Sequence, residues 1–141
     1  MRVEIARVAD VGGAVEFRCD AGTAVGYWEG RPPSVGDVVD VEVDVPDDVT
    51  EWSVRGDVVA GVLEVMGDGT RVRVAGTVEE IGDPVVVLRV GSGVILVEFV
   101  DGELVVGGSA GASVVGGGPE LSVGSVVEFV VPRIRLFPTN L

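Results

Sequence analysis

The sequence contains no lysine, no histidine and a single cysteine, and these absences exclude several kinds of chemistry. A serine nucleophile needs a histidine or lysine base, and the chain has neither. A zinc site needs several cysteine or histidine ligands, and Cys19 alone cannot provide them. We therefore expect a protein that is not an enzyme, with no metal and no cofactor. An enzyme that works through paired carboxylates ranks last among the alternatives.

Long apolar runs are also missing. No run of 18 or more apolar residues occurs, so the sequence predicts no membrane-spanning helix. The first residues, MRVEIARVADV, alternate apolar and charged side chains and lack the apolar core of a secretory signal. A lone cysteine agrees with a reducing compartment. We expect a cytoplasmic protein; an exported protein trimmed of its signal is the alternative.

Positive charge is scarce, because 10 arginines face 23 acidic residues and the net charge is −13. Nucleic acid and anionic lipid both bind through cations, so we expect neither as a partner. Residues 1–70 hold 15 acids and five arginines, and residues 71–141 hold eight acids and five arginines. The N-terminal half would therefore attract a basic protein, unless its acids serve only solubility.

Valine is abundant, with 36 residues. Valine is stiff at χ1 and packs well on a pleated sheet, and the 22 glycines and seven prolines divide the chain into short pieces. Alternation is strictest over residues 38–45, where every second residue is valine and acids lie between them. The sequence therefore predicts an all-β protein made of short strands and hairpins.

Two blocks of sequence recur in the same order. RVEIARVADVGGAVEF from Arg2 is similar to RVRVAGTVEEIGDPVVV from Arg71, at a spacing of 69 residues that becomes 70 after one insertion. SVGDVVDVEV from Ser34 is similar to SVGSVVEFVV from Ser122, 88 residues later. A hairpin and a glycine-rich loop over 101–118 fill the difference. The pattern predicts an internal duplication.

The repeat predicts two units. The first, over residues 1–69, carries most of the acids, and the second covers residues 70–141 with the inserted hairpin and loop. The stretch 57–66 could close the first unit or open the second.

Each unit contains a glycine followed by a valine-rich strand: Gly36 with Val38–Val45, and Gly124 with Val126–Val131. The order of hairpin, third strand, polar connection and long strand resembles the small five-stranded barrels of the OB and S1-like kind. The resemblance covers most of the chain, although SH3-like barrels carry the same short string. It implies two tandem small antiparallel barrels, and members of the class mostly bind nucleic acid, sugars or proteins.

The first candidate site is an acidic face. Asp40, Glu42 and Asp44 project from one side of the expected strand, and Asp47 and Asp48 follow it. Their spacing does not match a calcium-binding EF-hand loop. Our leading hypothesis is a non-catalytic binding or adaptor protein whose acidic face meets a basic protein, as an inhibitor or immunity-type protein would.

The second unit differs at the matching positions, where Glu128, Val130 and Pro132 stand. The matching face of the second unit is therefore apolar, and it must be covered by the first unit, by the inserted segment or by another chain. If another copy of the chain covers it, the protein is a homo-oligomer. Another alternative is a structural protein that assembles through free strand edges such as Val85–Val90.

The second candidate site is aromatic. Tyr27 and Trp28 are adjacent in an expected strand, so one ring should face outward. Arg18 and Arg31 are near in sequence, and an outward ring beside cations could stack on a base or a sugar. The alternative function is therefore a small-ligand or single-strand nucleic-acid binding barrel. Trp28 could equally cap the core.

Overall fold

The computed structural model describes residues 1–9, 12–54, 56, 61–67, 69, 71–100 and 121–139. Its regular elements in these ranges are eleven strands: β1 (Arg2–Val8), β2 (Ala14–Cys19), β3 (Gly22–Trp28), β4 (Val38–Asp44), β5 (Ser53–Val54), β6 (Val62–Met66), β7 (Arg71–Ile81), β8 (Val85–Val90), β9 (Gly93–Glu98), β10 (Val126–Val131) and β11 (Arg135–Pro138). The all-β prediction is confirmed. The predicted hairpin and loop over 101–118 lie outside the described residues.

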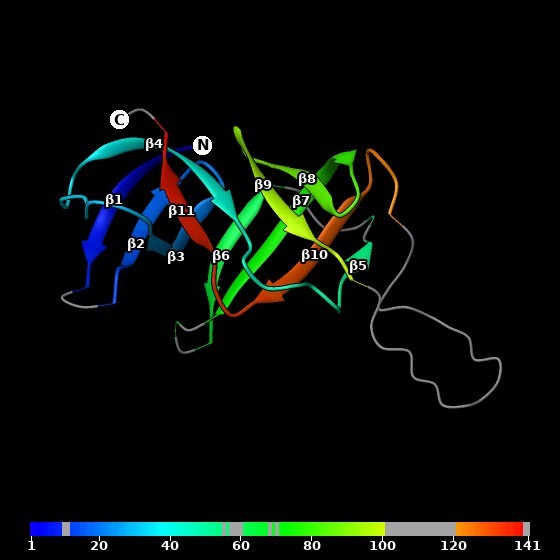
Figure 1. Ribbon diagram of the computed structural model, residues 1–141, viewed down its shortest axis with the longest axis horizontal. Coiled ribbons are helices and arrows are strands. Elements are labelled where there is room, and N and C mark those ends of the chain that lie inside the picture. The colour runs from blue at the N-terminus through cyan, green and yellow to red at the C-terminus, as the bar shows by residue number, and fades with distance from the viewer. Residues whose placement is uncertain are drawn as a thin grey trace.

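Five strands close into a barrel in the order β1–β2–β3–β11–β4, with β4 returning to β1. β1, β2 and β3 form an antiparallel meander, which short glycine turns permit. The C-terminal strand β11 fills the last place, between β3 and β4. Figure 1 shows it in red among the blue and cyan strands. This closed barrel is compatible with the OB-like shape that the sequence suggests.

The sheet is mixed, and the prediction of purely antiparallel units is wrong. β11 runs parallel to β3, and the end of β4 runs parallel to β9. Successive short strands joined by tight turns are antiparallel, which is what the turn pattern predicts. Both parallel pairs join strands that are far apart in the sequence, so the glycine and proline residues that mark turns could not predict them.

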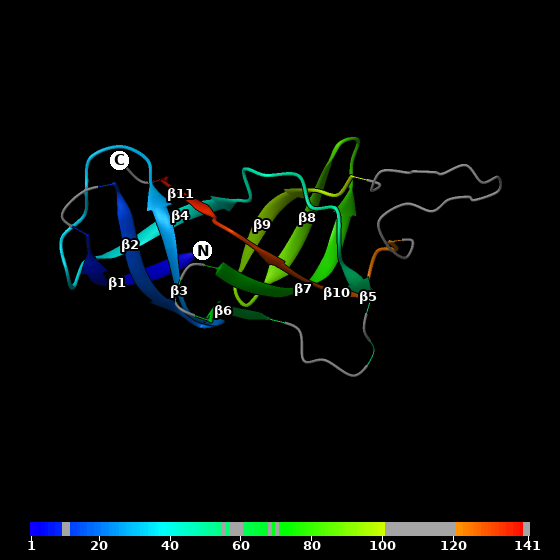
Figure 2. The same cartoon turned by 90° about the horizontal axis from the view of Figure 1, so that it is seen from below.

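The remaining strands form what we call the second lobe, in the order β9–β8–β7–β10–β5 with β6 beside β7. After β4 the chain leaves the barrel and enters this lobe (Figure 2). There the Val45 N–H donates to the Leu96 carbonyl at 2.9 Å, and the Val49 N–H donates to the Glu98 carbonyl at 2.9 Å. β5 then pairs antiparallel with β10. The chain returns to the barrel after β10, so the described residues contain two crossings between the lobes.

Period-two burial builds both lobes. In β4, Val41 and Val43 are buried while Asp40, Glu42 and Asp44 lie on the outer side, as predicted. The buried residues form one continuous cluster that draws on strands of the barrel and of the second lobe. No polar or charged residue is buried in the described ranges. The fold therefore depends on apolar packing that is shared by both lobes.

The β1–β2 hairpin of the barrel and the β7–β8 hairpin of the second lobe have the same pairing geometry. The register shifts between Ile5 and Arg7 in β1 and between Val78 and Glu80 in β7, so each strand carries a β-bulge at the same place. The equivalent residues Ile5 and Val78 are 73 positions apart. The sequence alignment gave 69, because valine-rich blocks match one another at more than one offset.

The strand that returns to each hairpin also begins in the same way. Gly36 has a φ of 93° and its N–H donates to the Ile5 carbonyl at 2.8 Å. Gly124 has a φ of 94° and its N–H donates to the Val78 carbonyl at 2.8 Å. A positive φ favours glycine, which explains why both lobes have one here. These two glycines are 88 positions apart, the same spacing as in the sequence alignment.

Candidate functional site

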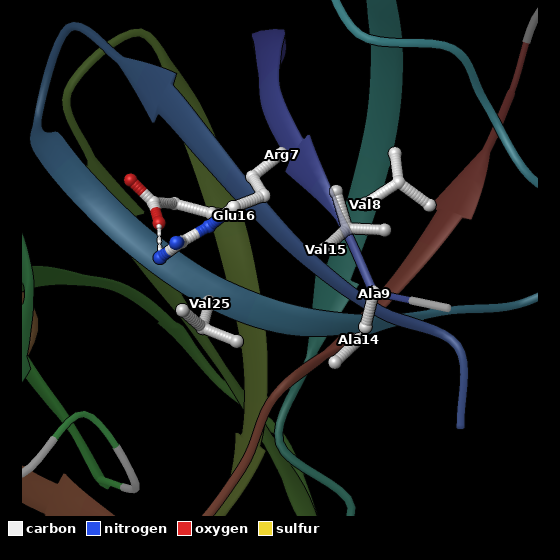
Figure 3. A pocket seen from close by; sticks show the side chains of 7 residues that line it. All are labelled: Arg7, Val8, Ala9, Ala14, Val15, Glu16 and Val25. Carbon is white, nitrogen blue, oxygen red and sulfur yellow. Dashed lines mark hydrogen bonds and ion pairs between the residues drawn. The ribbon is translucent and has the colours of Figure 1, made fainter. Parts of the chain in front are cut away.

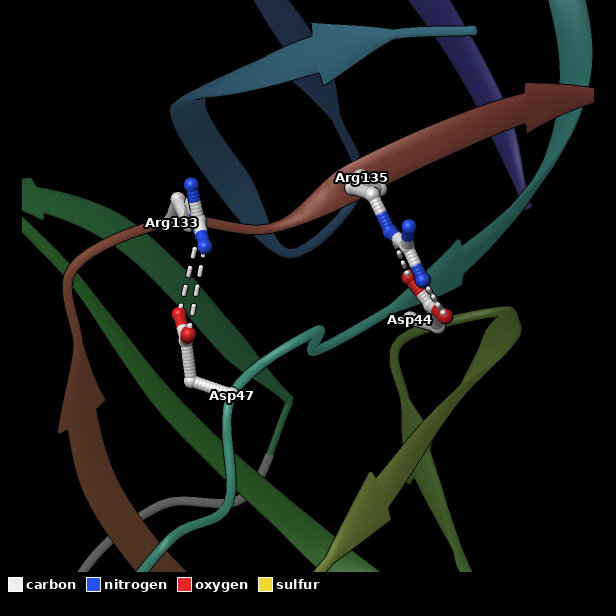
Figure 4. Close-up of polar contacts among 4 residues, drawn as sticks. All are labelled: Asp44, Asp47, Arg133 and Arg135. Atoms are coloured by element: carbon white, nitrogen blue, oxygen red, sulfur yellow. Dashed lines mark hydrogen bonds and ion pairs between the residues drawn. The ribbon is translucent and has the colours of Figure 1, made fainter.

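The acidic face lies on β4 and at the point where the chain crosses to the second lobe. Asp44 accepts two hydrogen bonds from Arg135 of β11, at 3.1 Å from Nε and 3.0 Å from Nη2. Asp47 accepts two from Arg133, at 3.2 and 3.3 Å. Figure 4 shows the two pairs side by side between the crossing segments. Hydrogen bonds and the nearby charge of Asp44 raise the pKa of the Arg135 guanidinium above its ordinary value. Both carboxylates therefore help to hold the crossing together.

The other acids of this face are less engaged. Asp40 pairs with Arg2 of β1, at 3.2 Å from Nε. Glu42 and Asp48 are exposed, and neither forms an ion pair with any residue that the structure describes. Asp40, Glu42 and Asp44 thus share the outer side of β4, Asp47 and Asp48 follow it along the chain, and three of the five acids pair with arginine. Sequence reasoning missed these arginines because they come from the two ends of the chain.

The matching strand of the second lobe also carries an ion-pair cluster. Arg73 donates to Glu128 and to Glu64, both at 2.5 Å. Burial opposes the charge on Arg73, but the two carboxylates outweigh it and raise the pKa of the guanidinium above its ordinary value. Next to Glu128, Val130 is 40% exposed. This outer face is therefore both apolar and charged, because an exposed valine lies beside the ion pairs of Arg73.

The four residues of the aromatic candidate do not come together. Tyr27 is 41% exposed, whereas Trp28 packs against the core and its Nε1–H donates to the Arg31 carbonyl at 2.8 Å. The predicted alternation of the two rings is present. Arg18 lies opposite Thr23, at the other end of the β2–β3 hairpin. Four residues of strand, about 13 Å, therefore separate Arg18 from the level of Tyr27.

A groove on the barrel was not predicted. One hollow of about 400 Å³ lies on the barrel where β1, β2 and β3 adjoin (Figure 3), lined by Arg7, Val8, Ala9, Ala14, Val15, Glu16 and Val25. A second hollow of about 670 Å³ shares Arg7, Glu16 and Val25 with it and reaches β6. Arg7 and Glu16 form an ion pair of 2.7 Å where the two meet. The signal in the sequence was Ala14 and Val25, small apolar residues at outward positions.

The only cysteine is half-buried at the end of β2. Burial raises the pKa of the Cys19 thiol, so the folded protein disfavours the thiolate. The stability that this contributes is present below the thiol's unfolded pKa and is lost as the pH rises through the folded pKa. We expect iodoacetamide at pH 8 to alkylate Cys19 several-fold more slowly in the native protein than in guanidinium chloride. Mass spectrometry over time measures both rates, and equal rates would contradict this environment for the thiol.

Comparisons with known proteins add no relative: no protein-family model, no curated protein and no solved structure matches the chain. Within the described ranges, no helix is long and apolar enough to cross a membrane. The same ranges contain no cluster of three or more histidine, cysteine or acidic side chains arranged to hold a metal ion. Function is therefore inferred from geometry and charge alone.

Proposed function

We propose that the chain is a non-catalytic binding protein whose barrel meets a basic protein through the outer face of β4. The supporting observation is the charge balance of this face, where five carboxylates are met by three arginines. Glu42 and Asp48 supply the excess charge. A basic partner could also compete for the carboxylates of Asp40, Asp44 and Asp47, since exposed ion pairs are weak and exchange readily.

The distribution of arginine favours a protein over a nucleic acid. Seven arginines in the described part of the chain each pair with at least one carboxylate: Arg2, Arg7, Arg18, Arg73, Arg89, Arg133 and Arg135. A phosphate backbone is bound by cations that release its counterions. Acidic faces, in contrast, steer basic proteins and set their orientation.

The double variant Glu42→Gln, Asp48→Asn is expected to weaken binding of an oligo-arginine peptide several-fold at low salt, because it removes the unpaired charge. The matched control is Glu80→Gln, Asp83→Asn, which changes the net charge equally at exposed positions around the β7–β8 turn. Fluorescence anisotropy of a labelled peptide measures both. An equal loss in the two variants would show that only net charge matters, and would overturn the proposed face.

The groove over β2 and β3 favours a second candidate function, the binding of a small ligand or a single strand. OB-like barrels bind oligonucleotides and oligosaccharides on this face. We expect Val25→Arg, which places a long side chain in both hollows, to abolish any change in tryptophan fluorescence on titration with oligosaccharides or oligonucleotides. If neither ligand class changes the fluorescence of the unaltered chain, this second function is excluded.

We propose further that the two lobes descend from one duplicated OB-like unit. The matched bulges and the matched Gly36 and Gly124 turns support this. In this proposal residues 1–69 and 70–141 remain the two units. The segment after β4 of the first unit completes the second lobe, and β11 of the second unit completes the barrel. The stretch left open by the sequence contains β6, which pairs with β7 of the second lobe. β8, named as a possible free edge, pairs with β7 and β9.

A further inference from the structure

Each lobe is completed by a segment from the other half of the chain. In the barrel, the Tyr27 N–H donates to the Ile134 carbonyl at 2.9 Å and the Glu29 N–H donates to the Leu136 carbonyl at 3.0 Å. In the second lobe, the segment after β4 lies along β9 and then pairs with β10. Figures 1 and 2 both show the two connections passing between the lobes. Neither lobe therefore has a full set of strands without the other.

The crossing segments are also buried and joined to each other. Val43 and Val45 on one segment, and Ile134 and Leu136 on the other, are at most 6% exposed. The pairs Asp44–Arg135 and Asp47–Arg133 connect the same two segments on their outer side (Figure 4). Loss of either lobe would release one segment, expose these side chains and break both ion pairs.

We infer that the crossing is a coupling device that makes the two lobes fold, unfold and respond to ligands as one unit. Unfolding of the second lobe removes the anchor that holds β11 in the barrel and leaves β3 and β4 with open edges. Unfolding of the barrel likewise frees the segment that runs between β9 and β10. Because a ligand that binds only the folded state stabilises that state, a partner bound to the barrel would also stabilise the second lobe.

The chain carries one tryptophan in each lobe, which makes the inference testable in the full-length protein. Trp28 lies in β3 of the barrel. Trp52 lies just before β5, and its ring packs edge-on against Phe99 of the second lobe with a centroid distance of 5.0 Å. The variant Trp52→Phe therefore reports on the barrel alone, and Trp28→Phe reports on the second lobe alone.

Leu88→Ala is introduced into both reporter chains, since Leu88 is fully buried in β8. Urea unfolding followed by fluorescence should show the two midpoints falling by the same amount. The inference would be overturned if the urea midpoint reported by Trp28 stayed unchanged while the midpoint reported by Trp52 fell. If Leu88→Ala does not fold, Leu88→Val gives the same comparison with a smaller shift.

The reciprocal substitution completes the test. Phe17 is fully buried in β2 of the barrel, and Phe17→Leu should lower the midpoint reported by Trp52 as much as the one reported by Trp28. Val35→Ala, at a position 65% exposed, is the control that should move neither midpoint. Separate transitions in any of these chains would mean that the lobes unfold independently.

Discussion

Leu136→Ala is expected to lower the free energy of unfolding by about 2–5 kcal/mol, the range for a large buried side chain cut back to alanine. Leu136 is fully buried in β11, the strand that closes the barrel. A Cβ built on Gly26 of β3 would lie 3.1 Å from the Leu136 side chain, so β3 keeps a glycine where this leucine packs. Urea denaturation followed by circular dichroism measures the loss.

Phe137→Ala is the matched control on the neighbouring position of the same strand, where the side chain is only half-buried. We expect a smaller loss there, because Phe137 lies on the outer side and its ring contacts the Arg135 guanidinium at 5.3 Å. A Leu136→Ala protein within about 0.5 kcal/mol of the unaltered chain would behave like a surface variant. That result would contradict the position of β11 in the barrel.

Gly22→Ala is the second substitution with a large expected effect. Gly22 begins β3 with a φ of 136°, a conformation that L side chains rarely adopt, and an added Cβ would lie 2.5 Å from the Leu63 carbonyl oxygen. Both backbones would have to move, so β6 would separate from the β2–β3 turn. We expect a loss of more than about 2 kcal/mol, from backbone strain and the clash together. Thermal unfolding measures it.

Gly30→Ala separates the two causes. Gly30 has a φ of 105°, but nothing lies within 4 Å of an added Cβ. The substitution should therefore show the conformational cost alone, about 1–3 kcal/mol, which is less than the loss at Gly22. Equal losses at the two glycines would mean that β6 does not approach the hairpin as closely as the structure shows.

Local features of the fold could be predicted from the sequence. The alternation over residues 38–45 placed the valines inside and the acids outside, because a strand turns successive side chains to opposite faces. The same rule showed that Tyr27 and Trp28 would face different ways. Glycine and proline marked the turns of the hairpins. Each of these signals depends on residues that are neighbours in the chain.

The closure of the barrel could not be predicted in this way. β3 and β11 are more than 100 residues apart, and nothing in either strand specifies the other as its partner. The repeated blocks align at an offset of 69 residues, whereas Ile5 and Val78, which precede the two matching bulges, lie 73 positions apart. In a chain with 36 valines, many registers look alike. The matched bulges are recognised from the strand pairing and not from sequence similarity.

The candidate site was predicted in part. The acids of β4 do share an outer face, but the arginines that meet them come from β1 and from the segment around β11. These arginines come close to the acids only because the barrel closes, and the sequence did not predict that closure. The groove over β2 and β3 was hidden as well, because β6 supplies one of its sides. A cytoplasmic location and a homo-oligomer stay predictions.

Amide hydrogen exchange measured by NMR at Tyr27 and Glu29 tests the closure of the barrel most directly. The Tyr27 N–H donates to the Ile134 carbonyl, and the Glu29 N–H donates to the Leu136 carbonyl. These hydrogen bonds form only if residues 134–136 lie beside β3. Strong protection at both amides, with cross-strand NOEs from β3 to residues 134–136, is the predicted result. Exchange at the rate of an unstructured peptide, with no such NOEs, would contradict the account.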